Sequence, residues 1–309
     1  MKISVALVIL CCILVPGVFS NPFGGMELEV IGGFGNLAFD HNRKTALSED
    51  PDDPGAFSPQ YFPLVLTRLS GASEGFAYDL GFERDPLMRN RLFSNIKVDT
   101  EYFFIEAGPF IGLFNSSKLP FNPGVSVGLG LMYPGIVFAE LRASSTLGII
   151  KMDEKGNNSQ HSADISLGFW VPHVICSLNM SIRNFALREQ TYLLIEDRLA
   201  RYFFSANVHT KNIPFTIKVD LGYQSLKRAY TTQTADSGSI VKNSETDEFK
   251  SLFIGLEGTY TFSPELKFLL GGEMPVYSWG VRPMRDPPKG TMLFTLRTGV
   301  VWTIPSKNS

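Results

Sequence analysis

The sequence predicts an all-β protein: a transmembrane, antiparallel, up-and-down β-barrel of about 14 strands. Two observations predict this fold class. Many segments alternate large apolar residues with small or polar ones, and the connections between them are alternately tight and long. A third observation is that no apolar run in the chain reaches the length of a transmembrane helix.

The first 20 residues have the organisation of a secretory signal peptide. Lys2 supplies a short positive region, and Ile3–Val15 is an apolar run too short for a membrane-spanning helix. Small residues precede a plausible cleavage point before Asn21. We therefore expect residues 1–20 to be removed and residues 21–309 to form a single transmembrane barrel domain.

Cysteine content and charge exclude several classes of protein. After cleavage only Cys176 remains, so a disulfide-stapled secreted domain is not expected. Acylation of Cys11 or Cys12 in a lipoprotein is an alternative, but the residues before them are not the small ones usual at such sites. The formal net charge of −2 offers no basic surface for nucleic acid, which is not expected as a partner.

Residues that could carry chemistry are sparse and scattered. The acidic run Glu49–Asp53 is typical of a solvated loop rather than of a calcium site. No serine–histidine or aspartate–histidine constellation is visible, so we expect no catalysis, no cofactor and no metal site. The four histidines lie on separate segments: His41, His161, His173 and His209.

The clearest strand pattern is Phe215–Tyr223, in which every odd position is large and apolar and every even position is small or polar. In a soluble sheet the apolar face would pack on a core. In a membrane barrel it would meet lipid, and Lys218 and Asp220 would point into the lumen. One strand cannot separate these two interpretations, so the number of such segments and their connections decide.

Thirteen other segments share this parity. In chain order the 14 predicted strands are Met26–Phe39, Tyr61–Ser70, Glu74–Glu83, Leu92–Val98, Phe103–Ile111, Val125–Tyr133, Val137–Leu147, Ala163–Val171, Val174–Ile182, Tyr202–Val208, Phe215–Tyr223, Leu252–Phe262, Leu266–Val276 and Met292–Trp302.

The connections between these segments fall into two classes. Tight turns such as Pro134–Gly135 and Ser263–Pro264 alternate with long polar segments such as His41–Gln60 and Thr231–Glu248. Phe185–Ala200 is ambiguous, either a connection with a short helix or longer strand ends. Because barrel turns stay short on one side and loops grow on the other, this alternation favours a membrane barrel over a Greek-key sandwich.

Charged residues fall almost entirely on the polar parity of the predicted strands. A Lys or Arg facing lipid near the bilayer midplane costs about 2–4 kcal/mol, so membrane insertion requires this segregation. An alternative is that these acids and bases pair across strands and fill the barrel without conducting. The residues predicted to line the lumen are Glu106, Glu140, Arg142, Asp164, Arg183, Arg201, Lys218, Asp220, Glu257, Lys267, Glu273 and Arg297.

The last strand carries the most specific motif. Arg297, Gly299, Trp302 and Ile304 resemble the assembly signal of Gram-negative outer-membrane β-barrels, in which a polar residue and a glycine precede alternating apolar residues. The resemblance implies outer-membrane lipid and the barrel-assembly machinery as partners, with short periplasmic turns and long extracellular loops. The chain departs from the pattern at its end, Pro305–Ser309, where the family usually has a terminal aromatic residue.

This resemblance covers the whole mature chain and concerns architecture rather than one subfamily. Fourteen strands suit small monomeric porins and long-chain fatty-acid transporters, but no N-terminal hatch precedes the first strand. We therefore expect a cell outer-membrane channel for passive or weakly selective diffusion of small polar solutes. Alternatives are a structural, adhesin-like or hydrophobic-ligand uptake barrel whose loops bind an external partner, and a soluble periplasmic or lipid-anchored β-protein.

Overall fold

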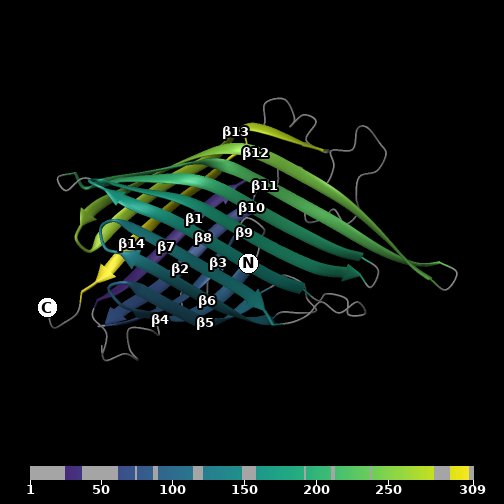
Figure 1. Cartoon of the computed structure of the whole chain (residues 1–309), viewed down its shortest axis with the longest axis horizontal. Helices are drawn as coiled ribbons and strands as arrows, with labels where there is room; N and C mark the ends of the chain where they lie inside the picture. The colour runs from purple at the N-terminus through teal and green to yellow at the C-terminus, as the bar shows by residue number, and fades with distance from the viewer. Residues whose placement is uncertain are drawn as a thin grey trace.

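A computed structural model shows one closed β-barrel of 14 strands (Figure 1). It describes residues 25–36, 62–73, 75–85, 90–113, 121–147, 158–190, 193–209, 213–236, 239–281 and 293–305. Each strand is antiparallel to its neighbours in the sequence, and β1 pairs with β14 to close the barrel. The predicted fold class and strand number are confirmed. Among the described residues, no helix is long and apolar enough to cross a membrane.

The strands from β9 to β13 are longer than those before them and than the last strand, β14. They are β1 (Met26–Gly35), β2 (Phe62–Ser73), β3 (Phe76–Arg84), β4 (Asn90–Asp99), β5 (Phe103–Leu113), β6 (Phe121–Tyr133), β7 (Val137–Thr146), β8 (Asn158–Val171), β9 (Val174–Gln190), β10 (Leu193–His209), β11 (Phe215–Asp236), β12 (Ser239–Ser263), β13 (Leu266–Val281) and β14 (Thr295–Ile304).

Closure of the barrel depends on a regular ladder between the first and last strands. It runs from Met26 opposite Ile304 to Gly35 opposite Thr295 without a register shift. This pairing gives both strands a partner on each side, so neither presents an open edge for association. It also places the start of β1 and the end of β14 at one end of the barrel, which we call the turn end; the opposite end is the loop end.

The tight turns at the turn end have residues suited to their backbone conformation. In the β6–β7 turn, the Ile136 amide donates to the Tyr133 carbonyl at 3.0 Å, and Gly135 has a φ of 73°. Glycine adopts this left-handed conformation without a steric penalty, which fits a type II turn. His173, with a φ of 68°, has the corresponding conformation in the β8–β9 turn.

The predicted loop Thr231–Glu248 is wrong, because β11 and β12 continue through nearly all of it. For Phe185–Ala200, the alternative of longer strand ends is confirmed, since β9 and β10 occupy nearly all of this segment. In Figure 1, β11 and β12 extend beyond the other strands at the loop end. Smaller extensions add 121–123 to β6 and 158–160 to β8, which the sequence had suggested were loop.

Several predictions concern residues outside the described part of the chain. These are the signal peptide at residues 1–20, all or most of the predicted loops at 41–60, 115–123, 152–160 and 281–290, and the continuation of the first strand to Phe39.

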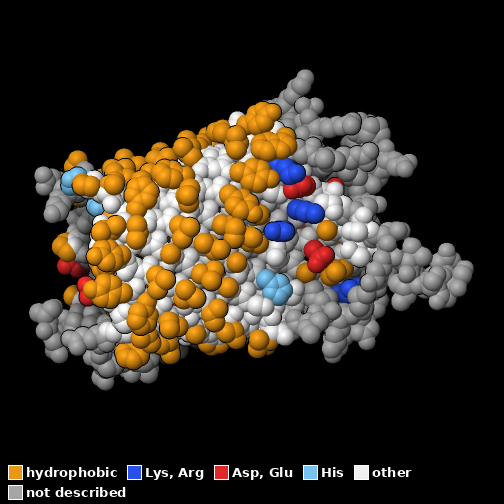
Figure 2. All heavy atoms as spheres, in the orientation of Figure 1, with side chains coloured by type: hydrophobic (Ala, Val, Ile, Leu, Met, Phe, Trp, Pro, Cys, Tyr) orange, Lys and Arg blue, Asp and Glu red, His pale blue; other side chains and the backbone are white. Residues whose placement is uncertain are grey.

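The outer wall of the barrel is apolar over most of its height. Outward side chains such as Ile96, Leu178 and Leu270 are more than 60% exposed, although they are large and hydrophobic. Figure 2 shows such side chains covering a broad band on one face, with charged side chains beside the band. A continuous exposed apolar band of this size is typical of a surface covered by lipid.

Candidate functional site

The predicted lumen residues face the inside of the barrel, as contacts between distant strands demonstrate. Arg201 on β10 donates to the Glu273 carboxylate on β13 at 2.5 Å, although β11 and β12 lie between these strands. Only side chains on the concave face can meet across two intervening strands. The side chains that alternate along the strands in step with Arg201 and Glu273 therefore face the inside of the barrel.

Two further ion pairs cross a single intervening strand at a glycine. Arg297 on β14 reaches Glu257 on β12 at 2.6 Å, and a Cβ added to Gly271 on β13 would lie 3.1 Å from the Arg297 Nε. Arg142 on β7 lies 3.5 Å from Glu106 on β5, across β6, where a Cβ at the intervening glycine would meet the arginine stem at 3.2 Å. The glycines thus leave the space that these pairs occupy.

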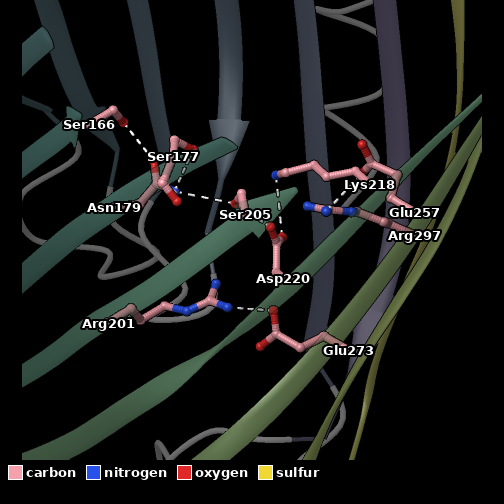
Figure 3. A network of polar contacts seen from close by, with 10 residues as sticks. All are labelled: Ser166, Ser177, Asn179, Arg201, Ser205, Lys218, Asp220, Glu257, Glu273 and Arg297. Atoms are coloured by element: carbon pink, nitrogen blue, oxygen red, sulfur yellow. Dashed lines mark hydrogen bonds and ion pairs between the residues drawn. The ribbon is translucent and has the colours of Figure 1, made fainter. Parts of the chain in front are cut away.

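Uncharged polar groups continue this network around the wall (Figure 3). Ser166 donates to the Asn179 side-chain oxygen at 2.8 Å, and the Asn179 amide donates to Ser205 at 3.2 Å. Ser205 donates in turn to Asp220, whose other oxygen lies 3.3 Å from the Lys218 ammonium. Four neighbouring strands, β8 to β11, are therefore linked by one run of inward polar side chains.

Almost all residues predicted to line the lumen take part in ion pairs. Lys267 is the exception, since it forms none within the described part of the chain. The role of the predicted lumen residues in a conducting pore stays a prediction. The pairs are Arg142 with Glu140 and Glu106, Arg183 with Asp164, Arg201 with Glu273, Lys218 with Asp220, and Arg297 with Glu257.

Phenylalanine rings support several of the inward cations. Phe104 lies 4.4 Å from the Lys97 ammonium and 5.2 Å from the Arg142 guanidinium, measured to the ring centroid. Arg201 lies 4.4 Å from the Phe253 ring and 5.4 Å from the Phe203 ring. A cation over an aromatic face gains about 0.5–2 kcal/mol, so these rings and the carboxylates together restrain the cations against the wall.

Sequence analysis did not select some of the inward groups as site residues. Arg68 pairs with Glu29 at 2.7 Å, and Arg91 pairs with Glu83 at 2.5 Å. Phe253 is 1% exposed and inward although it is apolar. The outward residues of β12 have even numbers, so the odd number of Phe253 could have indicated its inward direction. The inward direction of the arginine pairs was harder to predict, because alternation is less regular in β2 and near the start of β4.

The interior changes character toward the loop end, in the extended parts of β10–β12. The inward side chains Leu226 and Phe249 are only 2% and 1% exposed there. Arg228 donates two hydrogen bonds to Asp197, at 2.6 and 2.7 Å. Burial disfavours the charged guanidinium, but the Asp197 carboxylate outweighs this and raises the pKa of Arg228. Burial raises the pKa of the neighbouring Tyr230 hydroxyl.

The outward face of these strands therefore changes polarity along their length. On β11 the outward residues are apolar from Phe215 to Tyr223 and mostly polar from Ser225, while the inward face beyond Asp220 combines Leu226 with the charged Arg228. A strand needs about 9–11 residues to cross a tilted barrel wall, and Phe215–Tyr223 supplies that length. The change on the outward face marks the edge of the apolar band.

Aromatic rings form a row at this edge. Tyr202 and Tyr223 stack at 6.3 Å, Tyr223 and Trp279 lie 5.8 Å apart, and Trp279 and Tyr277 lie 5.6 Å apart, all between ring centroids. Tyrosine and tryptophan are enriched where membrane lipid meets water. A row of such rings at the edge of an apolar band is typical of a barrel wall that meets lipid.

The motif proposed as an assembly signal lies on β14. Arg297 points inward to Glu257, Trp302 is exposed on the outer wall, and Gly299 is packed against β1, where a Cβ would lie 2.8 Å from the Ile31 side chain. Ile304 ends the strand opposite Met26. Recognition of these residues by an assembly machinery stays a prediction.

Among the residues that the structure describes, no cluster of three or more His, Cys, Asp or Glu side chains could hold a metal ion. His161 contacts the Ser145 hydroxyl at 2.9 Å on the exposed rim. Cys176 is a free thiol on β9.

Comparison with known proteins gives matches only among solved structures. No family model and no curated protein matches the chain. A bacterial polysaccharide outer membrane secretin has a TM-score of 0.43 and 12% identity, covering 93% of this chain and 100% of that chain. A BenF-like porin from Pseudomonas fluorescens Pf-5 has a TM-score of 0.37 and 10% identity, and the match covers 93% of this chain and 99% of the porin chain. Outer-membrane expressed OmpT of Vibrio cholerae has a TM-score of 0.39 and 8% identity, and the match covers 92% of this chain and 99% of the OmpT chain.

The geometry itself assigns the architecture. The barrel is closed, has 14 antiparallel strands, is apolar outside and charged inside, and bears an aromatic row at one edge of its apolar band. This chain has the architecture of a porin-like outer-membrane β-barrel.

Proposed function

We propose that this protein is an outer-membrane channel through which small polar solutes diffuse passively or with weak selectivity. The observation that supports this most directly is the inward network of Figure 3, which places many polar and charged groups inside a closed apolar wall. Polar lumens of this kind are suited to water and small solutes.

Weak selectivity follows from the pairing of the inward charges. Arg201, Lys218 and Arg297 each lie within 4 Å of a carboxylate. A lumen lined by ion pairs presents local dipoles rather than a field of one sign, so neither cations nor anions are strongly excluded. The rings beneath Arg201 hold its charge at the wall and leave the axis to the solute.

Export and assembly form part of the same proposal. The signal peptide at residues 1–20 directs the chain out of the cytoplasm, and the β14 motif engages the barrel-assembly machinery. The apolar band then places the barrel in outer-membrane lipid. No catalytic step is part of this function.

Conductance in planar bilayers tests the channel. We expect stepwise current increases with a reversal potential near zero in a salt gradient. Arg201→Gln leaves the Glu273 carboxylate without its partner and should shift the preference toward cations. Glu273→Gln is the matched opposite and should shift it toward anions. Absence of current steps from correctly folded barrels, shown by heat-modifiable gel mobility, would contradict the proposal.

A second function, binding of an external partner, is favoured by the long β11–β12 hairpin. These strands have 22 and 25 residues, about twice what a membrane crossing requires. The hairpin projects beyond the barrel at the loop end (Figure 1). In this alternative, ligand binding depends on the hairpin whereas insertion into the membrane does not.

A further inference from the structure

Two cations stand directly opposite each other on the outer wall, beyond the edge of the apolar band. Arg198 on β10 and Lys227 on β11 are cross-strand partners and lie on the outward parity. Like charges in this position destabilise a sheet. Within the described part of the chain, neither side chain forms an ion pair of 4 Å or shorter. The two cations are therefore available to an anion from outside the chain.

A third cation borders this pair but is already compensated. Lys250 on β12 lies 3.0 Å from Glu248, which also accepts a hydrogen bond from Ser225 at 2.7 Å. Burial alone would raise the pKa of Glu248, but these partners and the charge of Lys227 outweigh it and lower the pKa. Glu248 is the cross-strand partner of Lys227, so it compensates part of that charge while its hydrogen bond and ion pair go to Ser225 and Lys250.

The position of the cations relative to the apolar band identifies the kind of anion. Tyr202 and Tyr223 form a cross-strand pair in the aromatic row, and Arg198 and Lys227 form the pair four residues farther along each strand. Four residues of strand span about 13 Å. That places the cations just outside the hydrocarbon, at the depth of lipid headgroups. Figure 2 shows Lys and Arg side chains, interspersed with Asp and Glu side chains, beside the apolar band at this end.

We propose that Arg198 and Lys227, bordered by Lys250, bind the phosphate of a membrane lipid headgroup on the outer wall at the loop end. The lipid chains lie along the apolar band below, and the phosphate relieves the repulsion between the two cations. This inference rests on the proposed membrane location, but it assigns a surface that takes no part in conduction.

Lipid binding by the full mature chain in detergent micelles tests the site. The probe is a fluorescent lipid with a phosphomonoester headgroup, and a phosphatidylcholine of equal chain length is the comparison. The double variant R198Q/K227Q should bind the phosphomonoester lipid about thirtyfold more weakly, since each basic side chain contributes about 1 kcal/mol near an anionic surface. Glu196→Gln, which removes an acid from the same face, should retain binding.

The controls separate this site from the channel and from free phosphate. Conductance of R198Q/K227Q should equal that of the parent protein, so a failed channel and a failed lipid site give different results. Inorganic phosphate at millimolar concentration should not displace the lipid. Equal lipid affinity of the double variant and parent, or displacement by inorganic phosphate, would overturn the proposal.

Discussion

At the scale of single residues, Gly271 shows how the interior is organised. Its missing side chain leaves room for the Arg297–Glu257 pair to cross β13, because a Cβ would lie 3.1 Å from Arg297 and 3.3 Å from Glu257. Gly271→Val should therefore lower the free energy of unfolding by about 1–3 kcal/mol, measured by urea unfolding from lipid vesicles. Gly32 is the matched control, since a Cβ there meets nothing within 4 Å.

Gly32→Val on β1 should leave the unfolding free energy unchanged or raise it, because valine is favoured in strands. Equal destabilisation by both substitutions would mean that loss of glycine itself, rather than displacement of the Arg297–Glu257 pair, determines the effect at Gly271.

At the scale of elements, β11 has two environments along one outward face. Val219 lies in the apolar band, opposite Ala206 and Leu256, whereas Ala229 lies beyond it, opposite Glu196 and Thr246. Val219→Lys should cost about 2–4 kcal/mol in a bilayer. Ala229→Lys should change stability by less than about 0.5 kcal/mol, since it is solvated and faces a carboxylate.

Urea titrations of both variants in lipid vesicles measure this difference. Similar costs at Val219 and Ala229 would show that the edge of the membrane does not lie between them. Such a result would also remove the depth argument for the phosphate site at Arg198 and Lys227.

At the scale of the whole molecule, the barrel is separable from its projecting hairpin. Tyr230 and Glu245 are cross-strand partners, so Asn-Gly in place of Thr231–Ser244 can connect them through a two-residue turn. This variant should keep heat-modifiable mobility and conductance, because closure depends on the β1–β14 ladder. Loss of external ligand binding in it would support the second function.

A truncation that removes Thr295–Ser309 provides the opposite case. Without β14, the neighbouring strands β1 and β13 each lose a partner, and the chain should not give a heat-modifiable form. The opposite result, in which the variant without β14 forms a barrel and the variant without the hairpin does not, would show that the hairpin rather than the β1–β14 ladder closes the structure.

Sequence alone was sufficient for the strands that keep one polarity on each face. The alternation in Phe215–Tyr223 predicted its strand and the inward direction of Lys218 and Asp220, which the structure shows joined at 3.3 Å. It failed for Thr231–Glu248 and left two alternatives open for Phe185–Ala200, where β9–β12 pass out of the apolar band. There the outward face becomes mostly polar and the inward face is mixed, so a pattern that assumes one apolar face no longer detects the strand.

The sequence by itself determined the fold class, the number of strands and which charges share a face, because side-chain direction alternates strictly along a strand. Tertiary structure decided which of those charges meet. Arg201 reaches Glu273 across two strands, and Arg297 reaches Glu257 over Gly271. These contacts depend on register, curvature and closure of the barrel, which set distances between residues far apart in the chain and leave no periodic mark in the sequence.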